Sequence, residues 1–439
     1  MRIKAVLVSF FLIFVISAAC SGCSPSEDQA AALEKTTVRF AWWGEEPRNR
    51  ATIKAIEAYS AENPDIRIVG EYVDWDAYYY KIKTQLASMS APDIISTMPD
   101  WKFDILNGNI FVDLADKRYK EYLDTGGMNG RMLDSLAKKD GALLGVPFGL
   151  SYSNIIVNSG EAKRAGIDLG PDTRLDWEQF INLGEEYSAS NKDKIFLLID
   201  LPLLRDDVFI PYLIQTCGRQ WINEDCTTGF SKDDAVQAFQ LIEELYADGL
   251  VQPIQQTMPY SGGISQNPKW SNGLALLTMG RTADFQLLKG PDIAIEVARL
   301  PVKKDAALTG IKVDAIMASV YKNSPCIKES IAFINWFLND EGAIGILADC
   351  RGYPAVDNAV GLLSREGKFD PAVETSDKIA GESPVMPYLP ITGSAELLSI
   401  CDEIIFSVAD GKLSAGQAGV KFYNSITDKL NEIFLNTRW

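Results

Sequence analysis

Three tryptophans stand beside carboxylates where predicted strands end. The pairs are Trp43 with Glu45, Trp75 with Asp74 and Asp76, and Trp101 with Asp100. An aromatic plane suits the apolar C–H face of a pyranose ring, and carboxylates suit its rim of hydroxyls. Because the loops after parallel strands face the crevice of an open α/β sheet, the pattern indicates contact with a carbohydrate. The alternatives are core packing for the tryptophans and helix capping for the aspartates.

Further candidates lie later in the chain. Tyr152, Trp221, Trp270 and Tyr353 are expected on the opposite side of the crevice, with packing in a core or on the surface as the alternative. Asp284 and Asp314 are further candidates for ligand contact. In contrast, the helical periodicity around Trp177 and Trp336 predicts that both belong to the core.

The chain contains no histidine. This absence excludes Ser-His-Asp and Cys-His nucleophile systems, imidazole zinc ligands and HExxH metallopeptidase chemistry. The sequence also lacks the GxxxxGK[ST], GxGxxG and GxSxG motifs of phosphate loops, dinucleotide sites and serine esterases. Only carboxylate, lysine, tyrosine or serine chemistry remains.

Strands and helices alternate through the first hundred residues. Apolar and polar side chains alternate over 37–42, and an apolar stripe at helical spacing follows over 51–59. A strand at 66–73, a helix at 79–88 and a strand at 92–95 continue the pattern. Such alternation is typical of an α/β fold with a mostly parallel sheet.

Later helices are predicted after Ser231, after Pro325 and over 415–435. The apolar positions expected to face inward in the last helix are Val420, Tyr423, Ile426, Leu430 and Phe434. At 439 residues and 47% hydrophobic content, the chain is long enough for two lobes.

The first residues have the layout of a bacterial export signal. Arg2 and Lys4 precede an apolar run over 5–16, which is too short to span a bilayer. Small residues then lead to Cys23, where removal of the signal would leave an amino-terminal cysteine for lipid attachment, as in bacterial lipoproteins. Cys20 is the alternative lipidation site, and a redox or metal pair of the two cysteines is less favoured. Residues 24–35 read as a solvated tether.

Five of the seven cysteines lie beyond the signal, where an exported protein can oxidise them. Cys217 and Cys226 are close enough in sequence for a disulfide around Trp221. The pairing of Cys326, Cys350 and Cys401 stays open. The formal net charge of −17 repels phosphate backbones, so no nucleic acid partner is expected.

An ordered series of short motifs is more specific than any one of them. The series is FAWWG at 40–44, NPDI at 63–66, YVDWDAY at 72–78, APDII at 91–95, GVPFG at 145–149, NIIVN at 154–158, GLALLTMG at 273–280 and RGYP at 351–354. In order and spacing it resembles the sugar-binding kind of bacterial extracellular solute-binding protein, family 1. The resemblance covers nearly the whole mature chain.

The resemblance implies an α/β fold of the periplasmic-binding-protein-like kind: a two-lobed clamp, each lobe a mostly parallel sheet flanked by helices, joined by hinge segments. It implies a monomeric protein that is not an enzyme and has no catalytic residue, cofactor or metal. Such a protein, lipid-anchored to the outer face of the bacterial cell membrane, would bind a carbohydrate ligand and deliver it to the permease subunits of an ABC transporter. We expect a signal at 1–23, lobe 1 at 36–148 and 274–320, and lobe 2 at 149–273 and 321–439.

Arg281 directly follows the expected strand that ends at Gly280, where related proteins often present an uncharged residue. A guanidinium there would face the cleft and make a forked contact with a carboxylate, which favours an oligosaccharide containing uronic acid. Lys102, Lys312 or Arg351 would assist. The alternative is a structural pair of Arg281 with Asp284.

The rival function is a secreted carbohydrate-active lipoprotein enzyme, a glycoside hydrolase or lyase that uses carboxylate, tyrosine or lysine chemistry. Its support is weak, because 59 acidic residues make accidental carboxylate pairs inevitable. A surface adhesin or a sensor subunit built on the same clamp is a third possibility.

Overall fold

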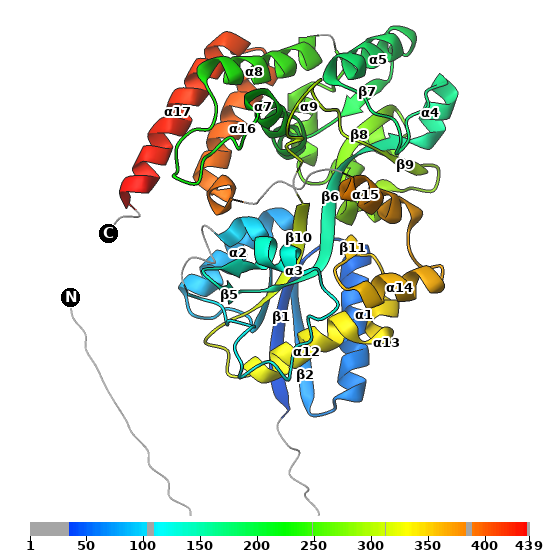
Figure 1. Cartoon of the computed structure of the whole chain (residues 1–439). Coiled ribbons are helices and arrows are strands. Elements are labelled where there is room, and N and C mark those ends of the chain that lie inside the picture. Colours follow the sequence, from blue (N-terminus) through cyan, green and yellow to red (C-terminus); the bar gives the residue numbers. More distant parts are fainter. Residues whose placement is uncertain (1–34, 103–108, 248, 312, 383–388, 437–439) are drawn as a thin grey trace, which may run out of the picture.

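A computed structural model describes residues 35–102, 109–247, 249–311, 313–382 and 389–436 (Figure 1). A nine-stranded sheet runs through the molecule, with strand order β2-β1-β3-β10-β6-β8-β7 and with β9 and β11 also paired to β6. The strands of this sheet are β1 Thr36–Trp43, β2 Ile66–Val73, β3 Ile94–Thr97, β6 Val146–Asn158, β7 Ile195–Leu198, β8 Ala275–Arg281, β9 Ile295–Ala298, β10 Val313–Val320 and β11 Tyr353–Pro354. The two ends of the strand order carry separate hydrophobic cores. The strands from β2 to β10 belong to one lobe, β7, β8 and β9 belong to the other, and β6 is shared.

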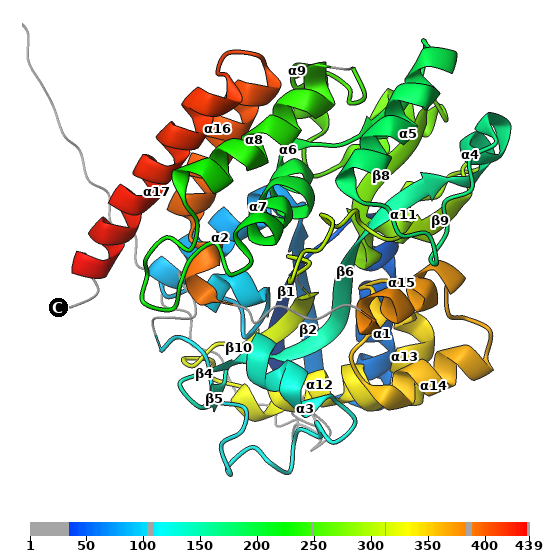
Figure 2. The same cartoon turned by 45° about the horizontal axis from the view of Figure 1, so that its top comes forward.

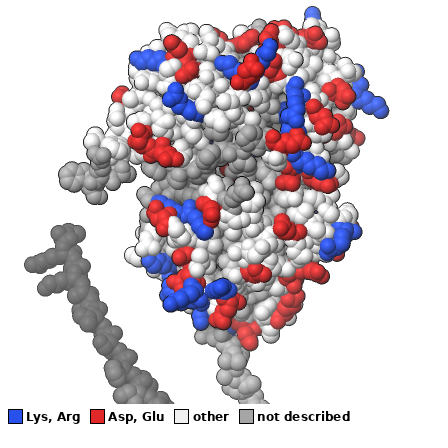
Figure 3. Space-filling model, viewed as in Figure 1, with Lys and Arg blue, Asp and Glu red and all other residues white. Residues whose placement is uncertain are grey.

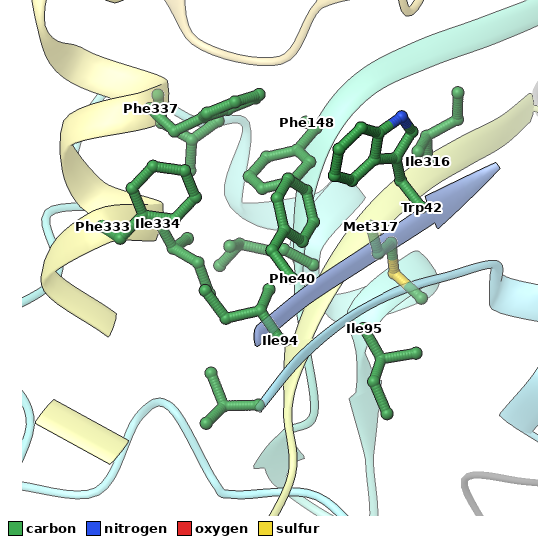
Figure 4. Close-up of a cluster of buried hydrophobic side chains, with 14 of the residues drawn as sticks. Phe40, Trp42, Ile94, Ile95, Phe148, Ile316, Met317, Phe333, Ile334 and Phe337 are labelled. Atoms are coloured by element: carbon green, nitrogen blue, oxygen red, sulfur yellow. The ribbon is translucent and has the colours of Figure 1, made fainter. Parts of the chain in front are cut away.

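The first lobe contains β1, β2, β3, β10, β11 and the first half of β6. Its other elements are α1 Glu46–Glu62, α2 Trp75–Ala87, α3 Gly130–Met132, β4 Lys138–Lys139, β5 Ala142–Leu143, α12 Ile327–Asn339, α13 Glu341–Leu347 and α14 Asp357–Arg365. Strands β2 and β3 both run parallel to β1. Phe40 of β1 lies at the centre of the core, among Phe148 of β6 and Phe333 and Phe337 of α12 (Figure 4).

The second lobe contains β7, β8, β9 and the second half of β6. Its helices are α4 Ser159–Ala165, α5 Trp177–Ser190, α6 Leu201–Leu203, α7 Ile210–Cys217, α8 Lys232–Ala247, α9 Ile254–Thr257, α10 Pro268–Ser271, α11 Phe285–Leu288, α15 Pro371–Gly381, α16 Ala395–Ala409 and α17 Ala415–Asn436. Helices α8, α16 and α17 lie side by side at one edge (Figures 1 and 2). Phe422 of α17 is fully buried and packs on Phe209 and Phe239.

Strand β6 connects the lobes. Its first half pairs antiparallel with β10, and its second half pairs antiparallel with β8 and β9. The short strand β11 pairs with β6 at Leu150 and Gly149. Gly352, just before β11, has a φ of 90°, a backbone conformation that glycine adopts readily and other residues rarely do. The backbone of 351–354 therefore lies close against β6 where the lobes meet.

The predicted α/β fold with two lobes is confirmed, and the expected elements are present. The strand expected at 66–73 is β2, and the helices expected after Ser231 and Pro325 are α8 and α12. In α17, Ile426 and Leu430 are buried as expected and Tyr423 and Phe434 are partly buried, but Val420 is 44% exposed. The other buried apolar positions of this helix are Ala415, Ala418, Phe422 and Ile433.

The packing divides the chain differently from the expected lobe boundaries. Residues 274–281 were expected in lobe 1, but β8 pairs parallel with β7 in the second lobe. Residues 327–363 were expected in lobe 2, but α12 and α14 pack in the first core. The division follows the pairing of the strands, which residue order alone does not give. The signal, Cys20 and Cys23 lie outside the described residues, as does most of the tether.

The cysteines in the described part of the chain are free thiols. The expected Cys217–Cys226 disulfide is therefore absent. The Cys217 thiol donates instead to the carbonyl of Arg219, 3.2 Å away at the end of α7, and Cys226 sits in a turn with a φ of 61°. Among the described helices, none combines the length and apolar character needed to cross a membrane.

Gly149 tests the close contact at the hinge. A Cβ at this position would lie 2.4 Å from the carbonyl oxygen of Arg351, and a backbone atom cannot move aside cheaply. We expect Gly149→Ala to lower the free energy of unfolding by about 1–3 kcal/mol in a denaturant titration. The control is Gly416→Ala in α17, where an added Cβ meets nothing within 4 Å and should stabilise by up to about 1 kcal/mol. Equal effects of the two substitutions would contradict the hinge contact.

Candidate functional site

A large cleft lies between the lobes, with a volume of about 1120 Å³. The first lobe contributes the end of β1, the start of α1 and the residues around the end of β2. The second lobe contributes the segments 259–266 and 279–288, and β10 contributes Asp314, Ala315 and Ile316. Six of the twelve predicted ligand-binding residues line this cleft: Trp43, Glu45, Trp75, Arg281, Asp284 and Asp314.

The first-lobe wall is aromatic. Trp75 is 40% exposed in the cleft, and its ring packs edge-on against that of Trp43, with 5.1 Å between centroids. Trp101 is buried and stacks behind Trp75 and Tyr78. Trp75 therefore offers a ring face to the cleft, while Trp101 supports it from behind rather than lining the cleft.

Tyr72 extends this wall. It is 44% exposed, lines the cleft and stacks on the buried Trp42, with 5.0 Å between the ring centroids. Tyr72 was not predicted as a site residue. The alternation of side chains along β2 and the position of Tyr72 three residues before Trp75 could have indicated that it lies at the cleft.

Two carboxylates of this wall stand at helix N-termini without capping them. Glu45 is the residue before α1 and Asp74 the residue before α2, and neither side chain makes a capping hydrogen bond. The capping alternative for Asp74 is therefore wrong. Both side chains line the cleft, where their oxygens can accept hydrogen bonds from hydroxyls. The side chains of Asp76, Asp100, Lys102 and Lys312 are outside the described part.

The cleft carboxylates repel one another. Partial burial raises the pKa of Glu45, and the neighbouring carboxylates of Asp284 and Asp74 raise it further. Burial likewise raises the pKa of Asp284, although the guanidiniums of Arg48 and Arg281 partly offset this. Burial and, for Glu45, the neighbouring carboxylates thus disfavour the ionised forms of Glu45 and Asp284.

Arg281 is already neutralised by protein carboxylates. Its Nη2 lies 3.0 Å from Asp206 and its Nε lies 3.3 Å from Asp314. Burial alone would lower the pKa of Arg281, but the carboxylates of Asp207, Asp314 and Asp206 outweigh burial and raise it. The guanidinium is therefore not the open cationic group that the sequence suggested. Its side-chain partners are Asp206 and Asp314 rather than Asp284.

Four predicted aromatic contacts lie elsewhere. Trp221 and Trp270 are each 1% exposed in the second lobe, where Trp221 stacks on Phe422 and the Trp270 indole donates to the carbonyl of Leu288. Tyr152 of β6 donates its hydroxyl to Asp377, and its ring lies near that of Tyr353. These side chains support the core and the hinge. Trp177 is buried as predicted, whereas Trp336 is only partly buried and donates to Glu62.

Sequence reasoning also missed the positive side of the cleft. The first three turns of α1 bring Arg48, Arg50 and Lys54 to its surface. Arg48 donates to the carbonyls of Cys350, Trp43 and Ala283, and the described residues give it no carboxylate ion pair. The sequence pattern that could have indicated these residues was their helical spacing after Trp43-Gly44.

The second-lobe wall includes the loop at 259–266. Asp200 is buried and accepts hydrogen bonds from the backbone N–H groups of Leu203 and Gly262. The bond to Gly262 ties this loop to the body of the lobe, on the side of the cleft opposite Trp75.

The raised pKa of Glu45 gives a prediction with a definite sign. The folded state binds the proton of Glu45 more tightly than the unfolded state, so wild-type stability gains from this group as the pH falls through its folded pKa. We expect Glu45→Gln to raise the melting temperature at pH 7, with the gap to wild type closing on acidification. The control is Glu46→Gln, whose exposed side chain pairs only with Arg50 and should give no gain. A gap that widened as the pH fell would contradict a raised pKa for Glu45.

Sequence and structure comparisons place the chain among known proteins. A sequence model of the family described as bacterial extracellular solute-binding protein matches residues 43–344. The lactose-binding protein of Rhizobium radiobacter is 27% identical over 222 residues, 48% of this chain and 50% of that protein. A putative binding protein of Brucella abortus is 24% identical over 200 residues, 45% of this chain and 46% of that protein. The chain thus spans about half the length of the curated relatives it matches.

Two solved structures share the fold. A periplasmic solute-binding protein of Pectobacterium atrosepticum has a TM-score of 0.81 at 22% identity, covering 91% of this chain and 100% of that one. A periplasmic oligogalacturonide-binding protein of Yersinia enterocolitica, in complex with saturated digalacturonic acid, has a TM-score of 0.81 at 20% identity with the same coverage. At these identities the likeness shows the fold alone. Because the family match covers more than half of its residues, the chain belongs to the bacterial extracellular solute-binding protein family.

Proposed function

We propose that the protein captures a carbohydrate, an oligosaccharide, in the cleft between its lobes and delivers it to the permease of an ABC transporter. The observation that carries the proposal is the first-lobe wall, where the open ring face of Trp75 stands beside the uncapped carboxylates of Glu45 and Asp74. A sugar ring presents the complementary surfaces, an apolar face and a polar rim. The named ligands of two similar proteins, lactose and an oligogalacturonide, support this class.

The cleft is large enough for more than a small solute. Its volume of about 1120 Å³ lies at the upper end of the range usual for ligand pockets. Tyr72 and Trp75 place two exposed rings along one wall, which suits successive sugar units rather than one. We therefore propose an oligosaccharide as the ligand.

Export and anchoring belong to the same proposal. The signal layout before Cys23, with Cys20 as the alternative, supports lipid attachment outside the cell membrane. The tether at 24–35 would then give the clamp freedom to reach its permease. The protein would act as a monomer, without cofactor or metal.

The finer proposal concerns the charge of the sugar. Since Arg281 is neutralised by Asp206 and Asp314, a preference for a uronate has to rest on α1. Arg48 fits this role, because within the described part of the chain its donors contact backbone carbonyls alone and each terminal nitrogen keeps a second N–H. A charge-assisted bond from that group to a ligand carboxylate would favour an acidic oligosaccharide.

Trp75 tests carbohydrate binding by stacking. We expect Trp75→Ala to weaken binding of oligosaccharides about tenfold or more, about 1.4 kcal/mol, in calorimetric titrations. The control is Tyr80→Ala, on the same helix, 72% exposed and not part of the cleft wall, which should bind like wild type.

Two outcomes would contradict the proposed function. The first is that Trp75→Ala and Tyr80→Ala bind with equal affinity every glycan that raises the melting temperature of the wild-type protein in a thermal-shift panel. The other is release of reducing ends from those glycans, because a binding protein leaves the bonds of its ligand intact and an enzyme of the rival class does not.

Arg48 tests the acidic character of the ligand. We expect Arg48→Gln to lower the ratio of uronate to neutral oligosaccharide affinity about tenfold, since one charge-assisted hydrogen bond contributes about 1.5–3 kcal/mol. The ratio is the readout because loss of the three carbonyl contacts weakens both ligands. Arg118→Gln, at a 69% exposed arginine of the first lobe, is the control and should leave the ratio unchanged. Arg281→Ala distinguishes the contribution of Arg281 from that of Arg48. If the affinity ratio falls in Arg281→Ala and not in Arg48→Gln, Arg281 rather than Arg48 binds the ligand carboxylate.

A further inference from the structure

Arg351 is a buried cationic group that has no carboxylate partner among the described residues. It is 4% exposed, and its Nη2 donates to the hydroxyl of Thr52 at 2.6 Å while its Nη1 lies 3.3 Å from the Cys350 sulfur. The guanidinium lies over the rings of Phe337 and Phe148, which Figure 4 shows in the first core. Its Nε has no hydrogen-bond partner within the described part of the chain. A charge in such a place is costly unless something compensates it.

The neighbouring charge makes this environment more positive. Arg48 donates its Nε to the carbonyl of Cys350, next to Arg351 in the chain. Burial lowers the pKa of Arg351 to about 10, with repulsion by Arg48 as a further cause. At neutral pH the Arg351 guanidinium therefore stays protonated, and a second, largely buried guanidinium, that of Arg48, stands close by in the cleft wall.

A small cavity borders Arg351. Its volume is about 30 Å³, enough for a single ion or water molecule, and apart from Arg351 its wall is mostly apolar, with Phe337, Leu347 and Ala359 among the lining residues. Val356, the residue before α14, also lines the cavity, and its side chain does not cap this helix. The amino terminus of α14 thus lies beside the cavity, although the N–H of Asp357 donates to the carbonyl of Gly127, and the Asp357 side chain is exposed to solvent.

We propose that this cavity binds a small monovalent anion, chloride in ordinary solution, against Arg351. A water molecule would satisfy the free Nε but leave the buried positive charge uncompensated, whereas an anion does both. The nearby amino terminus of α14 adds a smaller favourable field.

The position of the site connects it to the hinge and the cleft. Tyr353 and Pro354 pair with β6, and the carbonyl of Cys350 holds Arg48 at the cleft surface. An anion at Arg351 would therefore stabilise the segment 350–354, which supports both. The proposal does not depend on the identity of the carbohydrate.

Bromide, which replaces chloride and scatters anomalously, tests the site directly. Crystals of the wild-type protein soaked in sodium bromide should show an anomalous peak beside the Nε of Arg351. In solution, the melting temperature should rise by about 2–4 °C in sodium chloride relative to sodium gluconate at equal ionic strength, as expected for an anion that binds only the folded state.

Arg351→Met removes the charge while keeping an apolar side chain of similar length. We expect this variant to lose the chloride-dependent shift, whereas the control Arg118→Met, at an exposed arginine, should retain it. A cavity without an anomalous peak, or an undiminished chloride shift in Arg351→Met, would overturn the proposal. Should Arg351→Met fail to fold, the bromide soak of the wild-type crystal still decides.

Discussion

The two lobes share one strand, and the cleft exists because of it. Strand β6 has 13 residues, of which all but Ser153 are buried, and it pairs with β10 in one lobe and with β8 and β9 in the other. A strand buried on both faces cannot slip by one residue, since every side chain would move to the opposite face. The spacing of the lobes is therefore fixed along β6, and the motion left to the molecule is rotation about the segments that cross between them.

The hinge is held by polar groups as well as by packing. Thr282 accepts from the backbone N–H of Tyr152, its hydroxyl meets that of Ser376, and Asn154 donates to Ser376. These bonds tie β6, the turn after β8 and α15 together on the second-lobe side. The first-lobe side is held by the close approach of 351–354 to Gly149.

The sequence predicted what depends on local order and missed what depends on pairing between distant strands. Trp43, Glu45 and Trp75 could be placed at the cleft because each follows a strand whose neighbours run parallel to it. Trp221 and Trp270 were expected on the opposite wall, but Trp221 is buried against Phe422 of α17 and Trp270 is buried with its indole bonded to Leu288 of α11. The role of Arg281 was misjudged for a similar reason, since Asp206 lies 75 residues away and no local pattern indicates that the two meet. In α17, Ile426 and Leu430 were placed correctly, but Val420 was expected to be buried where Phe422 is, because both residues fit a helical stripe almost equally well.

Closure on a ligand requires unequal contacts with the open and closed forms. The two walls supply them differently. The first wall offers ring faces and the carboxylates of Glu45 and Asp74, and the pKa of Glu45 is raised by burial, by Asp284 of the second-lobe wall and by Asp74. The second wall offers a loop tied through Gly262 to Asp200, so its backbone groups are already ordered. A sugar whose hydroxyls accept from Arg48 and donate to Glu45 and Asp284 would relieve the repulsion among the carboxylates and bridge the walls at once. Because Glu45 and Asp284 lie on opposite walls, a ligand held by both walls relieves the repulsion between these two carboxylates, which favours the closed form over binding to one lobe alone.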